Sequence, residues 1–202
     1  MWKWIVGIVV ALCLLVLVGG WWGYQAVQKN LSPDGTERVT IAGTPTRVFA
    51  ALANGDSVPK WMANGNMVTS TRHGPLAVGD SLQVAMKSGF GMAQRPMTWQ
   101  ITEVNPDHLL AFELLSDSTH RVIAIRRDSL VAAGDSTNII STVASPLVDS
   151  IQAAGAKPRP QTRDAIVGLS STIIISAFRM QSKLDLLQLK GHIENRKVTL
   201  KR

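Results

Sequence analysis

The chain of 202 residues contains a single cysteine, Cys13, and few charged residues. One thiol cannot form an intramolecular disulfide, and it cannot supply a cysteine-based metal site by itself. We therefore expect no redox chemistry and no cofactor. Charged residues make up 17% of the chain, below the roughly 25% of an average globular protein. This composition argues against disorder over most of the chain.

Common catalytic motifs are also missing. The four histidines show no metal-ligand spacing such as H-E-x-x-H, so we expect no metal site. They are His73, His108, His120 and His192. No G-x-S-x-G elbow presents a serine nucleophile. The segment Gly89-Phe90-Gly91 lacks the third glycine of a dinucleotide site, and we interpret it as a mobile loop that could gate a cavity.

Acidic residues are fewer than basic ones, 14 against 21, which gives a formal net charge of +7. Such an excess of positive charge is typical of proteins that bind nucleic acid or anionic lipid headgroups, and it can also serve only to keep a protein soluble. Basic residues gather in Lys183–Arg202, without the interleaved aromatic residues that bind single-stranded nucleic acid. We therefore expect lipid headgroups and no nucleic acid as a partner. The alternative is a solvated helix end whose cations complement the helix dipole.

One long uncharged run, Ile5–Gly20, stands near the N-terminus. Aromatic residues flank it on both sides, as at the two interfaces of a membrane; they are Trp2, Trp4, Trp21, Trp22 and Tyr24. A helix from Trp2 to Tyr24, which is 23 residues, would be about 34 Å long and would span a hydrocarbon core of roughly 30 Å. The alternative is a cleaved signal peptide, but bulky Trp21 and Trp22 stand where cleavage needs small residues. We predict a single-pass transmembrane anchor at residues 1–24.

The orientation of this anchor is coded by few charges. Lys3 and the amino terminus precede the run, and Lys29 follows it. We expect the N-terminus in the cytoplasm and the remaining domain in the periplasm or another extracytoplasmic space. Turn-forming residues at 25–36 predict a short linker between the anchor and that domain.

Residues 37–196 predict one α+β domain, followed by a basic tail at 197–202. Alternation predicts a strand at Glu37–Ile41, and Thr44 with Pro45 predicts the start of a helix at Thr46–Ala53. Six later stretches have strand character and are joined by short polar turns. They are Met67–Arg72, Ser81–Lys87, Pro96–Val104, Leu109–Leu115, Arg121–Arg127 and Asn138–Ser145. Consecutive strands without intervening helices predict an antiparallel meander.

The last third of the chain predicts a long helix. Thr162–Arg196 contains no proline, and its apolar residues recur at helical spacing. Ile173–Ile175 is a competing strand signal, but the helical period continues on both sides of it. The preceding segment, 146–160, contains prolines and small residues and is interpreted as an insertion.

Four stretches follow one another along the domain: VTIAGTPTRVFAAL (Val39–Leu52), the Trp61 segment, HGPLAVGDSL (His73–Leu82) and MTWQITEVNPDHLLAFEL (Met97–Leu114). In the last stretch a tryptophan-bearing strand runs into an E-V-x-P turn and then an L-x-F strand. The order and spacing of the four stretches, and above all the last one, resemble the SRPBCC superfamily, also called the START-like or polyketide cyclase/dehydrase-like group. The resemblance implies a helix-grip fold, in which a curved antiparallel sheet wraps around a long C-terminal helix. The insertion and the anchor depart from the family's basic domain.

This fold implies an apolar cavity between the sheet and the long helix, and the family includes lipid carriers, ligand-binding proteins, aromatases and cyclases. Nine apolar residues are our candidates for lining that cavity, although each could instead fill a solid core. They are Trp61, Met86, Phe90, Met92, Trp99, Phe112, Ile125, Ile174 and Phe178. We predict binding of a lipid or other small hydrophobic molecule. The oligomeric state does not follow from the sequence.

Two other functions remain open. A cyclase or dehydratase-like enzyme would need a buried acid or base in the cavity, and Glu113 and His120 are the candidates. Glu103 and Glu113 lie on adjacent predicted strands and could form a carboxylate pair, but Arg126 and Arg127 are better partners for them. We therefore assign no catalytic residue. The third possibility is a partner-binding module whose interior is filled.

Overall fold

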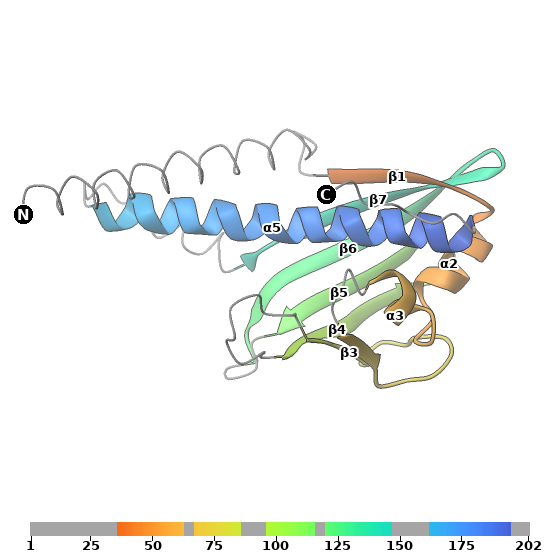
Figure 1. The fold of residues 1–202 in the computed structure, drawn as a ribbon, viewed down its shortest axis with the longest axis horizontal. Coiled ribbons are helices and arrows are strands. Elements are labelled where there is room, and N and C mark those ends of the chain that lie inside the picture. Colours follow the sequence, from red (N-terminus) through yellow and green to blue (C-terminus); the bar gives the residue numbers. More distant parts are fainter. Residues whose placement is uncertain (1–35, 63–66, 86–95, 116–119, 147–161, 195–202) are drawn as a thin grey trace, which may run out of the picture.

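A computed structural model describes residues 36–62, 67–85, 96–115, 120–146 and 162–194 (Figure 1). The anchor expected at 1–24, nearly all of the linker at 25–36 and the tail at 197–202 lie outside these residues, as does most of the insertion at 146–160. Within the described ranges, no helix combines the length and the apolar character needed to cross a membrane.

Seven strands form one antiparallel sheet, in the order β1-β7-β6-β5-β4-β3-β2 (Figure 1). The strands are β1 (Thr36–Ala42), β2 (Met67–Ser70), β3 (Ser81–Ala85), β4 (Pro96–Asn105), β5 (Leu109–Leu115), β6 (Val122–Ala133) and β7 (Ser136–Ala144). From β2 to β7 each strand pairs with the next one in the chain, and β1 closes the order against β7. The expected meander is therefore confirmed.

Alternation along each strand gives the sheet a buried inner face. In β1, for example, Glu37, Val39 and Ile41 are buried while Arg38 and Thr40 are exposed. Successive side chains of a strand point to opposite faces, so every second residue belongs to the interior. The strand β6 extends to Ala133, six residues beyond the predicted end at Arg127. The prediction ended the strand before Asp128, a charged residue that the fold buries on the inner face.

Two short helices cross from β1 to β2. Helix α2 (Pro45–Leu52) begins as predicted, with Thr44 as its N-cap: the Thr44 hydroxyl accepts from the Arg47 backbone nitrogen at 3.4 Å. Its apolar side, formed by Val48, Phe49 and Leu52, is buried. Helix α3 (Val58–Trp61) follows and places the fully buried Trp61 in the interior.

The long helix α5 (Thr162–Ile193) lies across the inner face of the sheet (Figure 1). Its C-terminal half buries Leu186, Leu189 and Ile193 against the sheet. The strand alternative at Ile173–Ile175 is wrong, because those residues belong to α5. The helical period of the surrounding residues therefore outweighed the strand preference of three β-branched residues.

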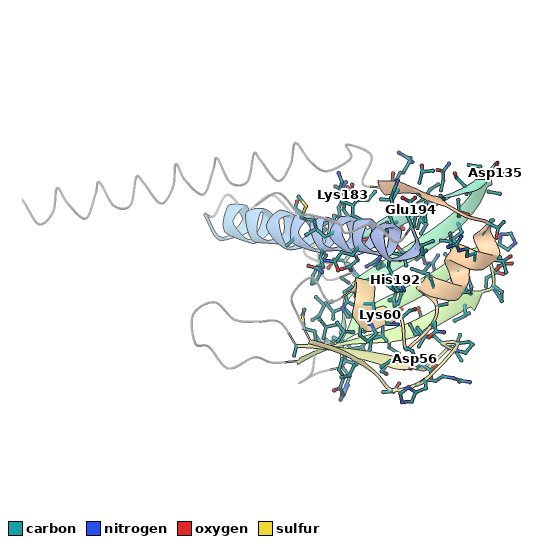
Figure 2. All side chains as sticks on the ribbon, turned by 45° about the vertical axis from the view of Figure 1, so that its right-hand side comes forward. Asp56, Lys60, Asp135, Lys183, His192 and Glu194 are labelled. Carbon is teal, nitrogen blue, oxygen red and sulfur yellow. The ribbon has the colours of Figure 1, made fainter. Side chains whose placement is uncertain are left out.

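Ion pairs fix the side of α5 that faces β1. Glu37 of β1 is buried, and its carboxylate lies 3.0 Å from Arg179 Nη2 and 3.5 Å from Lys183 Nζ. Farther along, the Glu194 carboxylate accepts from the Ala42 backbone nitrogen at 3.0 Å. Figure 2 labels Lys183 on α5 and Glu194 directly after the end of this helix. These contacts hold α5 in register with the edge strand of the sheet.

Candidate functional site

A cavity of about 300 Å³ lies between α5 and the inner face of the sheet. Its apolar walls come from the residue that follows α3, from β3 and β4, and from α5. The lining residues are Met62, Val84, Met97, Trp99, Ala177 and Phe178, together with the polar residues Arg126, Gln181, Ser182 and Asp185. A volume of this size is within the range of small-molecule sites in proteins. An interior that was only a packed core would leave no such space.

Aromatic rings form the apolar end of the cavity. The Trp99 ring meets Phe178 edge-on, with 6.1 Å between ring centroids and 89° between planes. It meets Phe112 in the same way at 6.4 Å and 85°. Edge-to-face contacts of this kind hold rings in fixed positions. Met62 and Met97 complete this wall with flexible side chains that adapt to ligands of different shape.

Three charged residues form the polar end, and all are fully buried. On β6, Arg126 and Asp128 share the inner face, and Arg126 Nε donates to both Asp128 oxygens at 3.1 and 3.0 Å. From α5, Asp185 Oδ2 accepts from Arg126 Nη1 at 2.7 Å. The other Asp185 oxygen accepts from Gln181 Nε2 at 2.8 Å. The Arg126 guanidinium also lies over two rings, 6.0 Å from Trp61 and 5.7 Å from Phe112.

The Nη2 nitrogen of Arg126 is the incompletely bonded atom of this cluster. It lies 2.9 Å from Asp128 Oδ2, an oxygen that already accepts from Nε. Its geometry makes no hydrogen bond, and Nη2 has no hydrogen-bond partner in the part of the chain that the structure describes. A guanidinium Nη2 carries two N–H donors, so at least one stays open even if the Asp128 contact is counted.

Burial changes the acidity of the cluster. Loss of water around Asp185 raises the pKa of its carboxyl to about 7, although the Arg126 charge and the hydrogen bonds from Arg126 and Gln181 pull it down. Burial by itself would lower the pKa of Arg126, but the charges of Asp128 and Asp185 outweigh burial and raise it. Arg126 therefore stays protonated, while Asp185 changes its protonation near neutral pH.

The nine candidate cavity residues fall into distinct groups. Trp99 and Phe178 line the cavity. Trp61 and Phe112 are buried and do not line the cavity, and the Arg126 guanidinium lies over both rings. Ile125 is on the other face of β6, because its neighbours Ala124 and Arg126 both face inward, so the expectation that it lines the cavity is wrong.

The remaining candidates cannot be placed at the cavity. Ile174 belongs to α5, but its side chain lies outside the described part, as do Met86, Phe90 and Met92 in full. Their role stays a prediction. The loop expected at Gly89-Phe90-Gly91 is outside the described residues as well.

The acidic and histidine candidates for catalysis lie away from the cavity. Glu113 pairs with Ile125 on the strand face that points outward, and His120 is exposed at a positive φ of 51°. Glu103 does not form a carboxylate pair with Glu113; its partner is Arg127, at 3.5 Å and exposed. The prediction of an arginine partner is thus correct for Arg127 and wrong for Arg126, which is buried at the cavity. Across the described ranges no cluster of His, Cys, Asp or Glu could hold a metal ion.

Sequence reasoning missed the polar end of the cavity. Ala124, Arg126, Asp128 and Leu130 alternate with outward residues along β6, so their shared face could have been recognised. On α5, Ser182 and Asp185 are four and seven residues after Phe178, which places them on its face of the helix. Asp185 falls among the apolar positions of this helix, and the sequence analysis did not single it out.

Comparison with known proteins supports one family. A family model described as "Polyketide cyclase / dehydrase and lipid transport" matches residues 33–157. No curated protein shows significant similarity to the chain.

Three solved structures resemble the chain over most of their length. A protein of unknown function from Staphylococcus aureus is 9% identical with a TM-score of 0.53, over 79% of this chain and 93% of its own. Ara h 8.0201 is 12% identical with a TM-score of 0.53, over 80% and 97%. The Aha1 dimer from Colwellia psychrerythraea is 14% identical with a TM-score of 0.50, over 81% and 97%. At these identities the likeness shows the fold alone, and it confirms the expected helix-grip architecture.

Proposed function

The chain belongs to the polyketide cyclase/dehydrase and lipid transport family, and from that premise we propose that it binds a lipid or another small hydrophobic molecule between the sheet and α5. The observation that carries the proposal is the cavity of about 300 Å³, walled by aromatic and methionine side chains. Burying apolar ligand surface contributes about 25 cal/mol per Å² to the binding free energy. A cavity of this size and lining is typical of ligand sites in proteins.

The test is to fill the cavity and ask whether the bound molecule is lost. Ala177 lines the cavity from α5 and its side chain is exposed, so Ala177→Phe adds a ring there without crowding the core. His192 is exposed on the same helix and does not line the cavity, so His192→Phe is the matched control. Figure 2 labels its position. Full-length chains are purified, and the molecules extracted from them are identified and counted by mass spectrometry.

We expect about one hydrophobic molecule per chain in the wild type and in His192→Phe, and a loss of at least about tenfold in Ala177→Phe. All three chains carry the same N-terminal segment, so any lipid that co-purifies with that segment is the same in each and cancels in the comparison. Equal recovery from all three chains would refute binding in this cavity.

We further propose that residues 1–24 anchor the chain as a single-pass transmembrane helix and hold the cavity near a bilayer on its extracytoplasmic side. The support is the uncharged run Ile5–Gly20 and its flanking aromatic residues. Membranes carrying the full-length chain would be washed at alkaline pH and then exposed to protease from the outer side. Retention after washing and digestion from outside are expected; release by the wash, or protection from the protease, would contradict the anchor or its orientation respectively.

Acid–base catalysis on the bound molecule is a second candidate, favoured by one observation. A buried carboxyl, Asp185, lines the cavity beside Arg126 and has a pKa raised to about 7, which suits proton transfer at neutral pH. A carrier returns the molecule that it bound, whereas an enzyme returns a product. Mass spectrometry of the extracted molecule before and after prolonged incubation with the chain distinguishes the two. The third possibility, a module with a filled interior, is disfavoured by the cavity.

A further inference from the structure

The polar end of the cavity has a hydrogen-bond donor to offer to a ligand. Arg126 lines the cavity, is only 2% exposed, and its Nη2 has no hydrogen-bond partner in the described part of the chain. Buried donors in proteins are almost always paired, because an unpaired one loses its water without gaining a partner. A ligand oxygen at this end of the cavity would supply the missing acceptor.

The charges around Arg126 decide which oxygen is acceptable. The guanidinium already faces two carboxylates, Asp128 at 2.9 to 3.1 Å and Asp185 at 2.7 Å. A ligand carboxylate or phosphate would add another anion to a buried site where the existing anions already match or exceed the single cation. Burying such an uncompensated charge is costly. A ligand ammonium would have to face the Arg126 cation, and Nη2 would still lack an acceptor.

An uncharged oxygen avoids both costs. A ketone oxygen accepts from Arg126 Nη2, and a hydroxyl accepts there while keeping its own hydrogen for one of the neighbouring carboxylate oxygens. The opposite end of the cavity is formed by Met62, Val84, Met97 and the rings of Trp99 and Phe178, which suit hydrocarbon. The cavity thus has one polar end and one apolar end.

We propose that the cavity selects an uncharged hydrophobic molecule with one terminal oxygen function, an alcohol or a ketone, whose oxygen accepts from Arg126 Nη2. Fatty acids and phospholipids are excluded by the carboxylates of Asp128 and Asp185. This inference rests on the proposed function and specifies the ligand class of the same cavity.

The experiment compares matched photoreactive probes on the full-length chain in lipid nanodiscs. Four ten-carbon probes carry the same diazirine and end in a hydroxyl, a ketone, a carboxylate or a methyl group. Labelling is carried out at pH 8, where a free carboxylic acid is ionised. Mapping of the labelled peptides separates probe in the cavity from probe at other places on the chain or in the bilayer.

We expect the alcohol and the ketone to label cavity-lining peptides at roughly tenfold lower concentration than the carboxylate or the methyl-ended probe, as a hydrogen bond to a charged donor implies. Asp185→Asn removes one carboxylate and keeps a side chain of the same shape. It is expected to raise labelling by the carboxylate probe roughly tenfold, with little change for the alcohol. Arg127→Lys, on the outward face next to Arg126, is the control and is expected to leave all four probes unchanged.

The outcomes separate this inference from the proposed function. If no probe labels the cavity, hydrophobic ligand binding itself fails. If all four label it equally, or the carboxylate labels it best, the cavity binds hydrophobic molecules and the selection for an uncharged oxygen is overturned. Unchanged carboxylate labelling in Asp185→Asn would overturn the charge argument alone.

Discussion

Replacing Asp185 with asparagine should change how the stability of the domain depends on pH. In the folded chain the pKa of Asp185 is raised to about 7, from a reference value of 3.8, chiefly because the carboxyl is buried. Between these two values the folded state keeps a proton that the unfolded state has released. Stability therefore falls as pH rises from about 4 to 7, and the loss is complete above the folded pKa.

The size of the effect follows from the pKa difference. One pKa unit corresponds to about 1.4 kcal/mol, so the interval from pH 5 to pH 8 spans a loss of about 3 kcal/mol from this group alone. The amide of Asp185→Asn does not ionise, and its oxygen can still accept from Arg126 Nη1. Gln181 can turn its own amide to accept from the new NH2 group. The groups facing the site, Arg126 and Asp128 on β6, are the same in both chains.

The assay is thermal unfolding of the full-length wild type and of Asp185→Asn, followed by circular dichroism at several pH values. Relative to Asp185→Asn, the wild type should lose about 6 to 12 °C in Tm between pH 5 and pH 8, at 2–4 °C per kcal/mol. Histidines titrate in the same range but are identical in both chains and cancel in the difference. Parallel curves for the two chains would show that Asp185 does not change protonation there, and the assignment of its pKa would be wrong.

Three further predictions concern the scaffold and use the same thermal assay. Leu186→Ala should cost about 3 kcal/mol, because it leaves a hole beneath α5 where the leucine is fully buried; a change below 1 kcal/mol would mean that α5 is not packed as described. Thr44→Ala should lower the free energy of unfolding by about 1 kcal/mol because α2 loses its N-cap, and Thr44→Ser should keep most of that stability because serine can cap in the same way. Gly55→Ala should cost about 3 kcal/mol, because a Cβ there would lie 2.0 Å from the Arg72 carbonyl oxygen. Its control, Gly134→Ala, has open space around it and only the strain of φ +62°, about 1 kcal/mol; equal losses in the two glycine variants would contradict the close approach.

The architecture could be predicted because its signals are local and repeated. Alternation of apolar and polar residues predicted the first strand, strand character between short polar turns predicted the others, and helical spacing predicted α5. The end of β6 was missed because Asp128 is charged and buried, which the usual alternation of apolar-in and polar-out residues does not anticipate. Its burial depends on Arg126 and on Asp185, a partner far along the chain.

The candidate site could be predicted only where its residues carry a local signal. Trp99 and Phe178 could be placed at the cavity from the strand and helix faces alone. Ile125 was misplaced because an apolar residue on a strand was assumed to point inward, although Arg126 beside it takes the inner face. A buried ion pair between a strand and a helix is a property of the folded chain, and single positions in the sequence do not specify which charges will meet.

The cluster of Arg126, Asp128 and Asp185 is an inefficient way to stabilise a fold. Moving charges out of water costs more than their attraction often returns, and apolar residues of similar volume are frequently as stabilising. Here the charges are placed beside an open cavity rather than inside a filled core, and one guanidinium donor is left without an acceptor. A purely structural ion pair gains nothing from either arrangement. Both arrangements have a purpose if the last hydrogen-bond partner of Arg126 arrives with the ligand, so that the site is completed only when the cavity is occupied.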